Sequence, residues 1–84
     1  MFLHLGGDVI IPKKDVIAIL NVRAQNSPIT REFLEIVRSE KTVQIIAEKG
    51  KEKSYVLTRE QIYVSPISCS TLKKRAEAII FTVD

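Results

Sequence analysis

The first nineteen residues constrain the fold of this chain most strongly, because short apolar runs alternate there with turn signals. Phe2–Leu5 is followed by Gly6-Gly7-Asp8 and then by a second apolar run, Val9–Ile11. Glycine adopts the positive φ of tight hairpin turns without steric cost, so the pattern predicts a β-hairpin. Pro12-Lys13-Lys14-Asp15 then breaks the second run.

A third strand and a helix follow this block. Val16–Val22 is almost continuously apolar, which predicts a strand covered on both faces. Ser27-Pro28 is a typical helix start, since serine caps free N–H groups and proline fits the first helical position. We expect the helix to run through Arg38 and to bury one apolar stripe, which consists of Ile29, Phe33, Ile36 and Val37.

The second half of the chain repeats the strand pattern and ends in another helix. Thr42–Ala47 and Ser54–Thr58 flank a charged segment with one glycine, which predicts a hairpin with a polar tip. Gln61–Val64 is a further strand. A second helix is expected to start within Ser68–Thr71 and to stop near Ala78, with one apolar face made of Leu72, Ala76 and Ile79. The apolar tail that follows suits either a strand or packing on a neighbouring subunit.

The order β-β-β-α-β-β-β-α predicts an α+β fold with a mostly antiparallel sheet, in one domain over residues 1–84. Hydrophobic residues make up 45% of the chain and aromatic residues 6%, so the core must be aliphatic. A domain this short buries only about 60–65% of its unfolded surface. Small aliphatic domains often gain stability by assembling, which predicts a homo-oligomer.

Few residues offer catalytic or metal-binding chemistry, so we expect no enzyme and no cofactor. His4 is the only histidine and is interpreted as a surface or sheet-face residue, and Cys69 is the only cysteine. One cysteine and one histidine cannot make a zinc site, and the three glycines form no phosphate-binding loop. The lone cysteine, the absence of a signal-peptide pattern and the lack of a long apolar run favour a cytoplasmic protein without membrane contact.

The charge pattern leaves two functions open. The formal net charge is +3, and the surplus lies in the first and last thirds of the chain. The cations that form groups are Lys13, Lys14, Lys51, Lys53, Lys73, Lys74 and Arg75. Each group alone suits an ordinary solvated surface, whereas together they suit contacts with DNA phosphates, which symmetric assembly would multiply. The alternative is a scaffold module that binds a protein partner without touching DNA.

Several motifs together resemble the RemA/RemB family of extracellular matrix regulatory proteins from Gram-positive bacteria. They are His4-Leu5-Gly6-Gly7-Asp8, Val16-Ile17-Ala18-Ile19, Asn26-Ser27-Pro28-Ile29 and the long run Tyr63–Arg75. The run Ser65-Pro66-Ile67-Ser68 continues through Ser70-Thr71-Leu72 to Lys73-Lys74-Arg75, and it looks most like the RemB branch. The similarity covers nearly the whole chain.

The resemblance implies a cytoplasmic regulator of biofilm matrix genes that forms a ring on a LytTR-like fold and binds DNA with basic residues. In the RemA branch, paired arginines follow the hairpin glycine, whereas here Gly50 precedes Lys51-Glu52-Lys53. Lysine lacks the bidentate fork of arginine. Lys51 and Lys53 are the expected phosphate contacts, with Lys13 and Lys14 on an adjoining edge. Lys73, Lys74 and Arg75 are either further contacts or part of a subunit interface. A paralogous regulator is a possible partner, and the glutamate in the tip favours the scaffold alternative.

Overall fold

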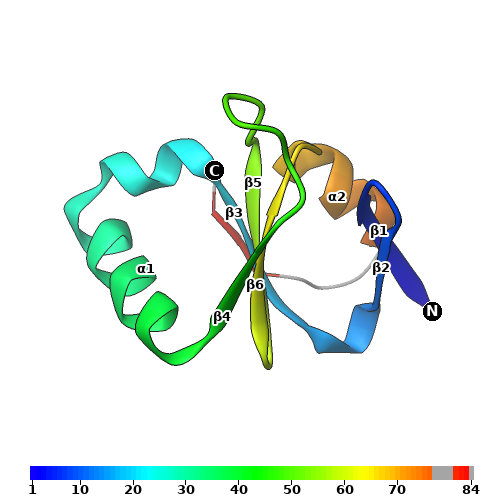
Figure 1. Ribbon diagram of the computed structural model, residues 1–84, viewed down its shortest axis with the longest axis horizontal. Coiled ribbons are helices and arrows are strands. Elements are labelled where there is room, and N and C mark those ends of the chain that lie inside the picture. The colour runs from blue at the N-terminus through cyan, green and yellow to red at the C-terminus, as the bar shows by residue number, and fades with distance from the viewer. Residues whose placement is uncertain (77–80, 84) are drawn as a thin grey trace.

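The computed structural model describes residues 1–76 and 81–83 and has the predicted α+β architecture (Figure 1). Two α-helices and two 3₁₀ turns connect the strands. The strands are β1 (Phe2–Gly6), β2 (Val9–Pro12), β3 (Val16–Asn21), β4 (Thr42–Ile45), β5 (Ser54–Thr58), β6 (Gln61–Ser65) and β7 (Phe81–Val83). The helices are α1 (Pro28–Glu40) and α2 (Cys69–Ala76), and the 3₁₀ turns are η1 (Lys13–Asp15) and η2 (Val22–Asn26).

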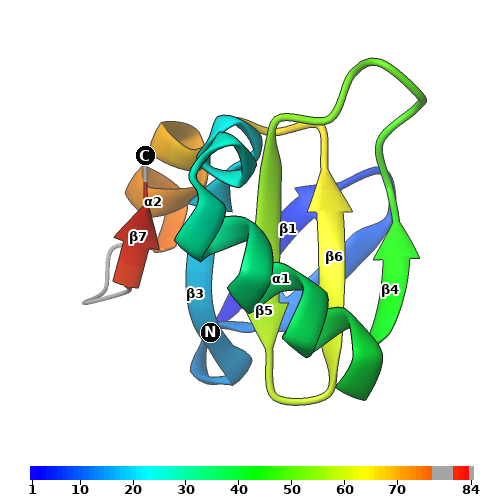
Figure 2. The same ribbon diagram turned by 90° about the vertical axis from the view of Figure 1, so that its left-hand side faces the viewer.

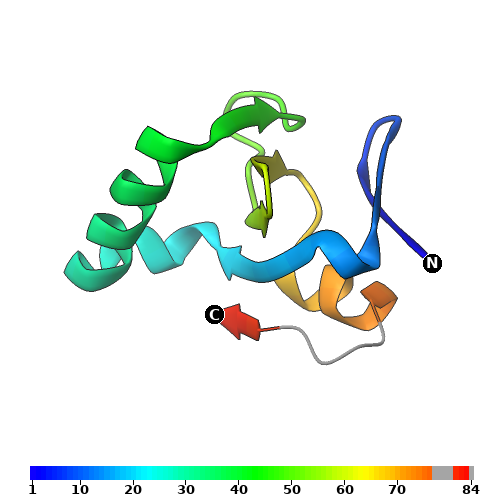
Figure 3. The same ribbon diagram turned by 90° about the horizontal axis from the view of Figure 1, so that it is seen from below.

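The predicted N-terminal hairpin is confirmed, but it forms a sheet of its own. Strands β1 and β2 pair antiparallel, with Leu3 opposite Ile11, and the turn between them has Gly6 at φ 120° and Gly7 at φ 53°. Strand β3 leaves this pair and enters a five-stranded sheet in the order β4-β6-β5-β3-β7. The hairpin therefore packs on the main sheet as a separate layer (Figure 3).

The prediction of a hairpin between residues 42 and 58 is wrong, because β4 and β5 are not neighbours. Strand β5 pairs antiparallel with β3 on one side and with β6 on the other. The β5–β6 turn contains only Arg59 and Glu60 and is closed by Thr58, whose hydroxyl donates to the Gln61 carbonyl at 2.7 Å. Because both edges of β5 are occupied, β4 joins the free edge of β6 in parallel.

The main sheet is mixed and separates two apolar clusters. It lies between α1 on one side and α2 with the hairpin on the other (Figure 1). Helix α2 and the hairpin cover one face, where Leu3, Leu5, Ile19 and Leu72 are buried. Helix α1 covers part of the other face, where Ala18 and Leu20 lie in the second cluster. Neighbouring residues of β3 thus point into different clusters, which confirms the prediction that this strand is covered on both faces.

The predicted buried stripe of the first helix is only partly correct. Helix α1 buries Leu34 and Val37, whereas Ile29 is 81% exposed, Phe33 44% and Ile36 54%. Five apolar residues, including Leu34, span about 160° of the helix circumference, which is wider than one contact stripe, so periodicity could not fix the rotation of the helix against the sheet. Three large apolar side chains remain in contact with water as a result.

The second helix buries Leu72 and Ala76 as predicted. The predicted helix end near Ala78 and the position of Ile79 lie outside the described residues. Of the two expectations for the tail, the strand is observed: β7 pairs parallel with β3, and Ala18 lies opposite Phe81.

Candidate nucleic-acid interface

Three strands of the main sheet begin or end together at one end of the molecule. Asn21 is the last residue of β3 and pairs with Ser54, the first residue of β5, which also pairs with the last residue of β6, Ser65. The segments that enter or leave here are η2, residues 46–53 and residues 66–68, and they lie together at the top of Figure 1. We call this region the loop end of the sheet.

Four cations project from segments at the loop end. Arg23 belongs to η2, and Lys49, Lys51 and Lys53 belong to the connection between β4 and β5. All four side chains are exposed. The loop end is therefore the place where this fold gathers positive charge from more than one segment.

Two hydrogen bonds hold the backbone of Lys53 in place. Its N–H donates to the Ser65 carbonyl at 2.9 Å, and its own carbonyl accepts from the Val22 N–H at 3.1 Å. These two bonds join the connection to β6 and to the start of η2. The position of Lys53 relative to the sheet is consequently well defined.

Lys51 lies at the tip of the connection in a tight turn. Its N–H donates to the Glu48 carbonyl at 2.9 Å, and Gly50 has φ 87°, a conformation that favours glycine. The Lys51 ammonium also lies 3.4 Å from a Glu48 carboxylate oxygen. Both groups are largely in water, so this ion pair is weak and a phosphate can compete with it.

Arg23 is not among the grouped cations expected from the sequence. The structure places it beside Lys53, because Arg23, Lys53 and Ser68 all line one shallow pocket of about 320 Å³. The Arg23 N–H donates to the Asn21 side-chain oxygen at 2.9 Å, which turns the chain at the end of β3. An arginine two residues after an asparagine at a strand end is the local signal, but its proximity to Lys53 depends on the topology.

Lys13 and Lys14 do not adjoin Lys51 and Lys53 in this chain. They belong to η1, which leads into the other end of β3, where Val16 pairs with Thr58. The five residue steps from Val16 to Asn21 separate the two ends by about 17 Å. The expected adjoining edge is therefore absent within one copy.

Lys73, Lys74 and Arg75 lie on the exposed side of α2, opposite the buried Leu72 and Ala76. Arg75 reaches back toward the hairpin, and its guanidinium lies 3.5 Å from the His4 carbonyl oxygen. Arg75 thus contacts the N-terminal hairpin, whereas Lys73 and Lys74 have exposed side chains.

The described residues offer no cluster of three or more metal-binding side chains. His4 is exposed, with its Nε2 atom 2.7 Å from the Gly7 carbonyl oxygen, and Cys69 is buried next to the main sheet. Within residues 1–76 and 81–83, neither helix has the length and apolarity needed to cross a bilayer.

The fold and the loop end define a class: a small α+β domain with a mixed sheet and a group of exposed cations on the loops at one end of it. The family model for RemA-like proteins, described as "Extracellular matrix regulatory protein A-like", matches residues 2–76. The chain therefore belongs to the RemA-like family. It is also 40% identical over 84 residues to Extracellular matrix regulatory protein B of Bacillus subtilis (strain 168), an alignment that covers 100% of this chain and 99% of that protein. The resemblance noted in the sequence is confirmed.

Proposed function

We propose that this protein regulates production of extracellular matrix by binding DNA through the phosphate backbone, as a homo-oligomer in the cytoplasm. The name of its Bacillus relative supports the regulatory role. The observation that carries the DNA contact is the gathering of Arg23, Lys51 and Lys53 at the loop end. A LytTR-like relationship of the fold and closure into a ring belong to the same proposal, which assigns the chain no catalytic role.

The arrangement favours phosphate contacts over base readout. The cations project from loops and are spaced along one end of the sheet, and phosphate contacts of this kind position a protein without specifying sequence. Each copy offers only a few such contacts, so one copy would bind weakly and with strong salt dependence. Several copies on one duplex would raise the affinity, because each later contact is intramolecular.

The double variant Lys51→Ala/Lys53→Ala tests this proposal. Each lost phosphate contact should reduce the slope of log Kd against log salt by about 0.9 per copy, and binding should weaken similarly on unrelated duplexes. Titrations by fluorescence anisotropy over a range of salt concentrations measure both quantities. Arg59→Ala is the control for each single variant, Lys51→Ala and Lys53→Ala, since Arg59 is an exposed cation at the opposite end of the sheet and its loss changes the net charge by the same one unit.

Two results would contradict the proposal. One is the absence of binding by the native protein to any duplex at low salt. The other is an equal effect of Arg59→Ala and of each single lysine variant, which would mean that only net charge matters. Lys13, Lys14, Lys73 and Lys74 enter the same titrations singly. Neighbouring copies are needed to bring Lys13 and Lys14 near the loop end, because they lie at the other end of β3.

The second candidate function is a scaffold module that acts through a protein partner such as a paralogous regulator. Glu48 pairs with Lys51, and Glu52 stands between the two lysines, which lowers the net charge of the tip. A module of this kind would leave DNA unbound at low salt and would bind its partner with the same salt-insensitive affinity in the Lys51→Ala/Lys53→Ala variant.

A further inference from the structure

Helix α1 carries an exposed apolar strip. Ile29, Phe33 and Ile36 are 81%, 44% and 54% exposed, and their spacings of four and three residues place them on one side of the helix. Seven residue steps make this strip about 10 Å long. We call it the α1 ridge.

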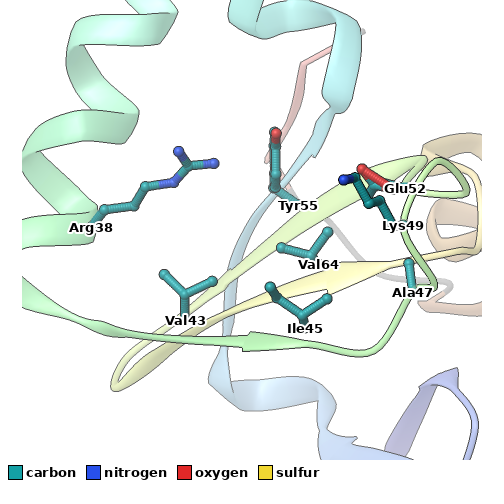
Figure 4. Close-up of a pocket in the computed structure, with 8 residues that line it drawn as sticks. All are labelled: Arg38, Val43, Ile45, Ala47, Lys49, Glu52, Tyr55 and Val64. Carbon is teal, nitrogen blue, oxygen red and sulfur yellow. The ribbon is translucent and has the colours of Figure 1, made fainter.

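A concave apolar surface lies on the sheet beside the same helix (Figure 4). It is an open trough of about 570 Å³, and its apolar walls come from Val43, Ile45, Ala47, Tyr55 and Val64. Ile45 is 70% exposed, although it lies on a strand of the main sheet. The stretch from Val43 to Ala47 is about 13 Å long, close to the length of the α1 ridge. We call this surface the β4 trough.

The ridge and the trough lie on different sides of the molecule. Arg38 lines the trough and projects over the Tyr55 ring, with its guanidinium carbon 5.5 Å from the ring centroid. Ile36 precedes Arg38 by two residues, about 200° around the helix axis. No residue of the ridge lines the trough. Figure 2 shows that α1 crosses the strands diagonally and leaves the upper parts of β4 and β6 uncovered.

The charges at the two surfaces are complementary. Arg38 and Lys49 line the trough, with Glu52 beside Lys49 (Figure 4). Glu40 lies within the angular range of the ridge, and Glu32 lies at its margin beside Ile36. No carboxylate among the described residues lies within ion-pair distance of Arg38 or Lys49, and no cation lies so near to Glu32 or Glu40.

We propose that the α1 ridge of one copy docks in the β4 trough of a second copy. Each chain carries both halves of the contact, which match in length, in apolar character and in charge. The inference rests on the homo-oligomer in the proposed function and names the surfaces that build it. Since the two halves lie on different sides, a pair leaves one ridge and one trough free, and copies add until the assembly closes on itself.

Two variants test the proposal, each with one surface blocked. Phe33→Lys places an ammonium on the ridge, where Arg38 and Lys49 of the trough would repel it. Ile45→Lys places an ammonium on the floor of the trough. Both positions are exposed in the single chain, so folding should be retained. Glu35→Gln on α1 and Gln44→Lys on β4 are the controls, because each raises the net charge by one unit at an exposed position outside both surfaces.

Light scattering and sedimentation give the decisive result. Each variant alone should be monomeric, with association weakened by about thirtyfold or more, while the controls assemble like the native chain. An equimolar mixture of the two variants should form a dimer and nothing larger, because only one intact ridge and one intact trough remain. Ile29→Lys should behave like Phe33→Lys if the latter variant misfolds.

Three outcomes would overturn the proposal. Assembly that survives both blocking variants would place the contact elsewhere. Loss of assembly in Phe33→Lys alone, without dimer in the mixture, would indicate ridge-to-ridge pairing. A monomeric native chain would leave both surfaces for another partner. These measurements use no DNA, and so they are independent of the loop-end titrations. A stable assembly that ignores DNA would contradict the proposed function but leave this inference standing.

Discussion

Two serine side chains at the loop end are completely buried. Ser54 and Ser65 are both 0% exposed. The Ser54 hydroxyl donates to the Ile67 carbonyl at 2.7 Å, and the Ser65 hydroxyl donates to the Leu5 carbonyl at 2.5 Å. The Ser65 oxygen also accepts from the Ile67 N–H at 3.0 Å. One side chain therefore satisfies buried groups of the hairpin and of the segment that leads into α2.

Replacing Ser65 by alanine should destabilise the protein by about 1–3 kcal/mol, because the Leu5 carbonyl and the Ile67 N–H lose their partner. Urea unfolding at a fixed protein concentration measures the change. The slope of the unfolding free energy against urea concentration should stay the same. Ser70→Ala is the control, since Ser70 is exposed, and it should stay within about 0.5 kcal/mol of the native protein. Equal stability of the two variants would mean that the buried hydroxyl contributes nothing.

At the scale of the element, the sequence predicts which segments are strands and helices better than it predicts their neighbours. The Gly6-Gly7 turn and the Ser27-Pro28 helix start depend on local backbone chemistry, and both are found where expected. The short β5–β6 turn places β6 on the edge of β5 that β4 was expected to use. Strand β4 therefore pairs with β6 instead. Likewise, Leu34 is buried instead of Phe33 because of how α1 crosses the sheet.

The N-terminal hairpin approaches the segment after β6 so closely that Gly6 has no room for a side chain. A Cβ atom at Gly6 would lie 3.0 Å from Cδ of Pro66, whereas nothing lies within 4 Å at Gly50. Both glycines have a positive φ, of 120° and 87°. Gly50→Ala should cost about 1–2 kcal/mol from backbone strain, and Gly6→Ala should cost a further 1–3 kcal/mol or so from the contact with proline.

Thermal or urea unfolding of the two glycine variants checks this difference. The comparison sets the contact between the hairpin and Pro66 against an open position, and both positions have a positive φ. Equal destabilisation would show that the hairpin can move away from the main sheet without loss of stability.

At the scale of the whole molecule, the topology decides which cations act together. Lys51 and Lys53 are close in sequence, and their common position at the loop end was predictable. Arg23 joins them only because β3 and β5 end together, and Lys13 and Lys14 are kept apart by the length of the same strand. The distribution of charge along the sequence predicts neither the proximity of Arg23 nor the separation of Lys13 and Lys14. The candidate site was therefore half predictable: the tip from the sequence, and its partners from the strand order.

If copies assemble through the α1 ridge, the thermal stability of the native protein should depend on its concentration, because association stabilises only folded chains. A tenfold increase should raise the midpoint by about 4–8 °C, since it changes the free energy per subunit by roughly 1 kcal/mol. Calorimetry at several concentrations measures this shift. The Phe33→Lys variant should melt at the same temperature at every protein concentration. A concentration dependence equal to that of the native chain would contradict assembly through the α1 ridge.

The connection between β4 and β5 is held at both of its ends by adjacent residues of one strand. The Ala47 N–H donates to the Val64 carbonyl at 3.1 Å, and the Lys53 N–H donates to the Ser65 carbonyl at 2.9 Å. Residues 48–52 therefore leave and return at almost the same point, so their number and chemistry can vary without disturbing the strands. Relatives with this sheet are free to exchange lysine, arginine or glutamate there, and binding preference can diverge while the framework stays constant.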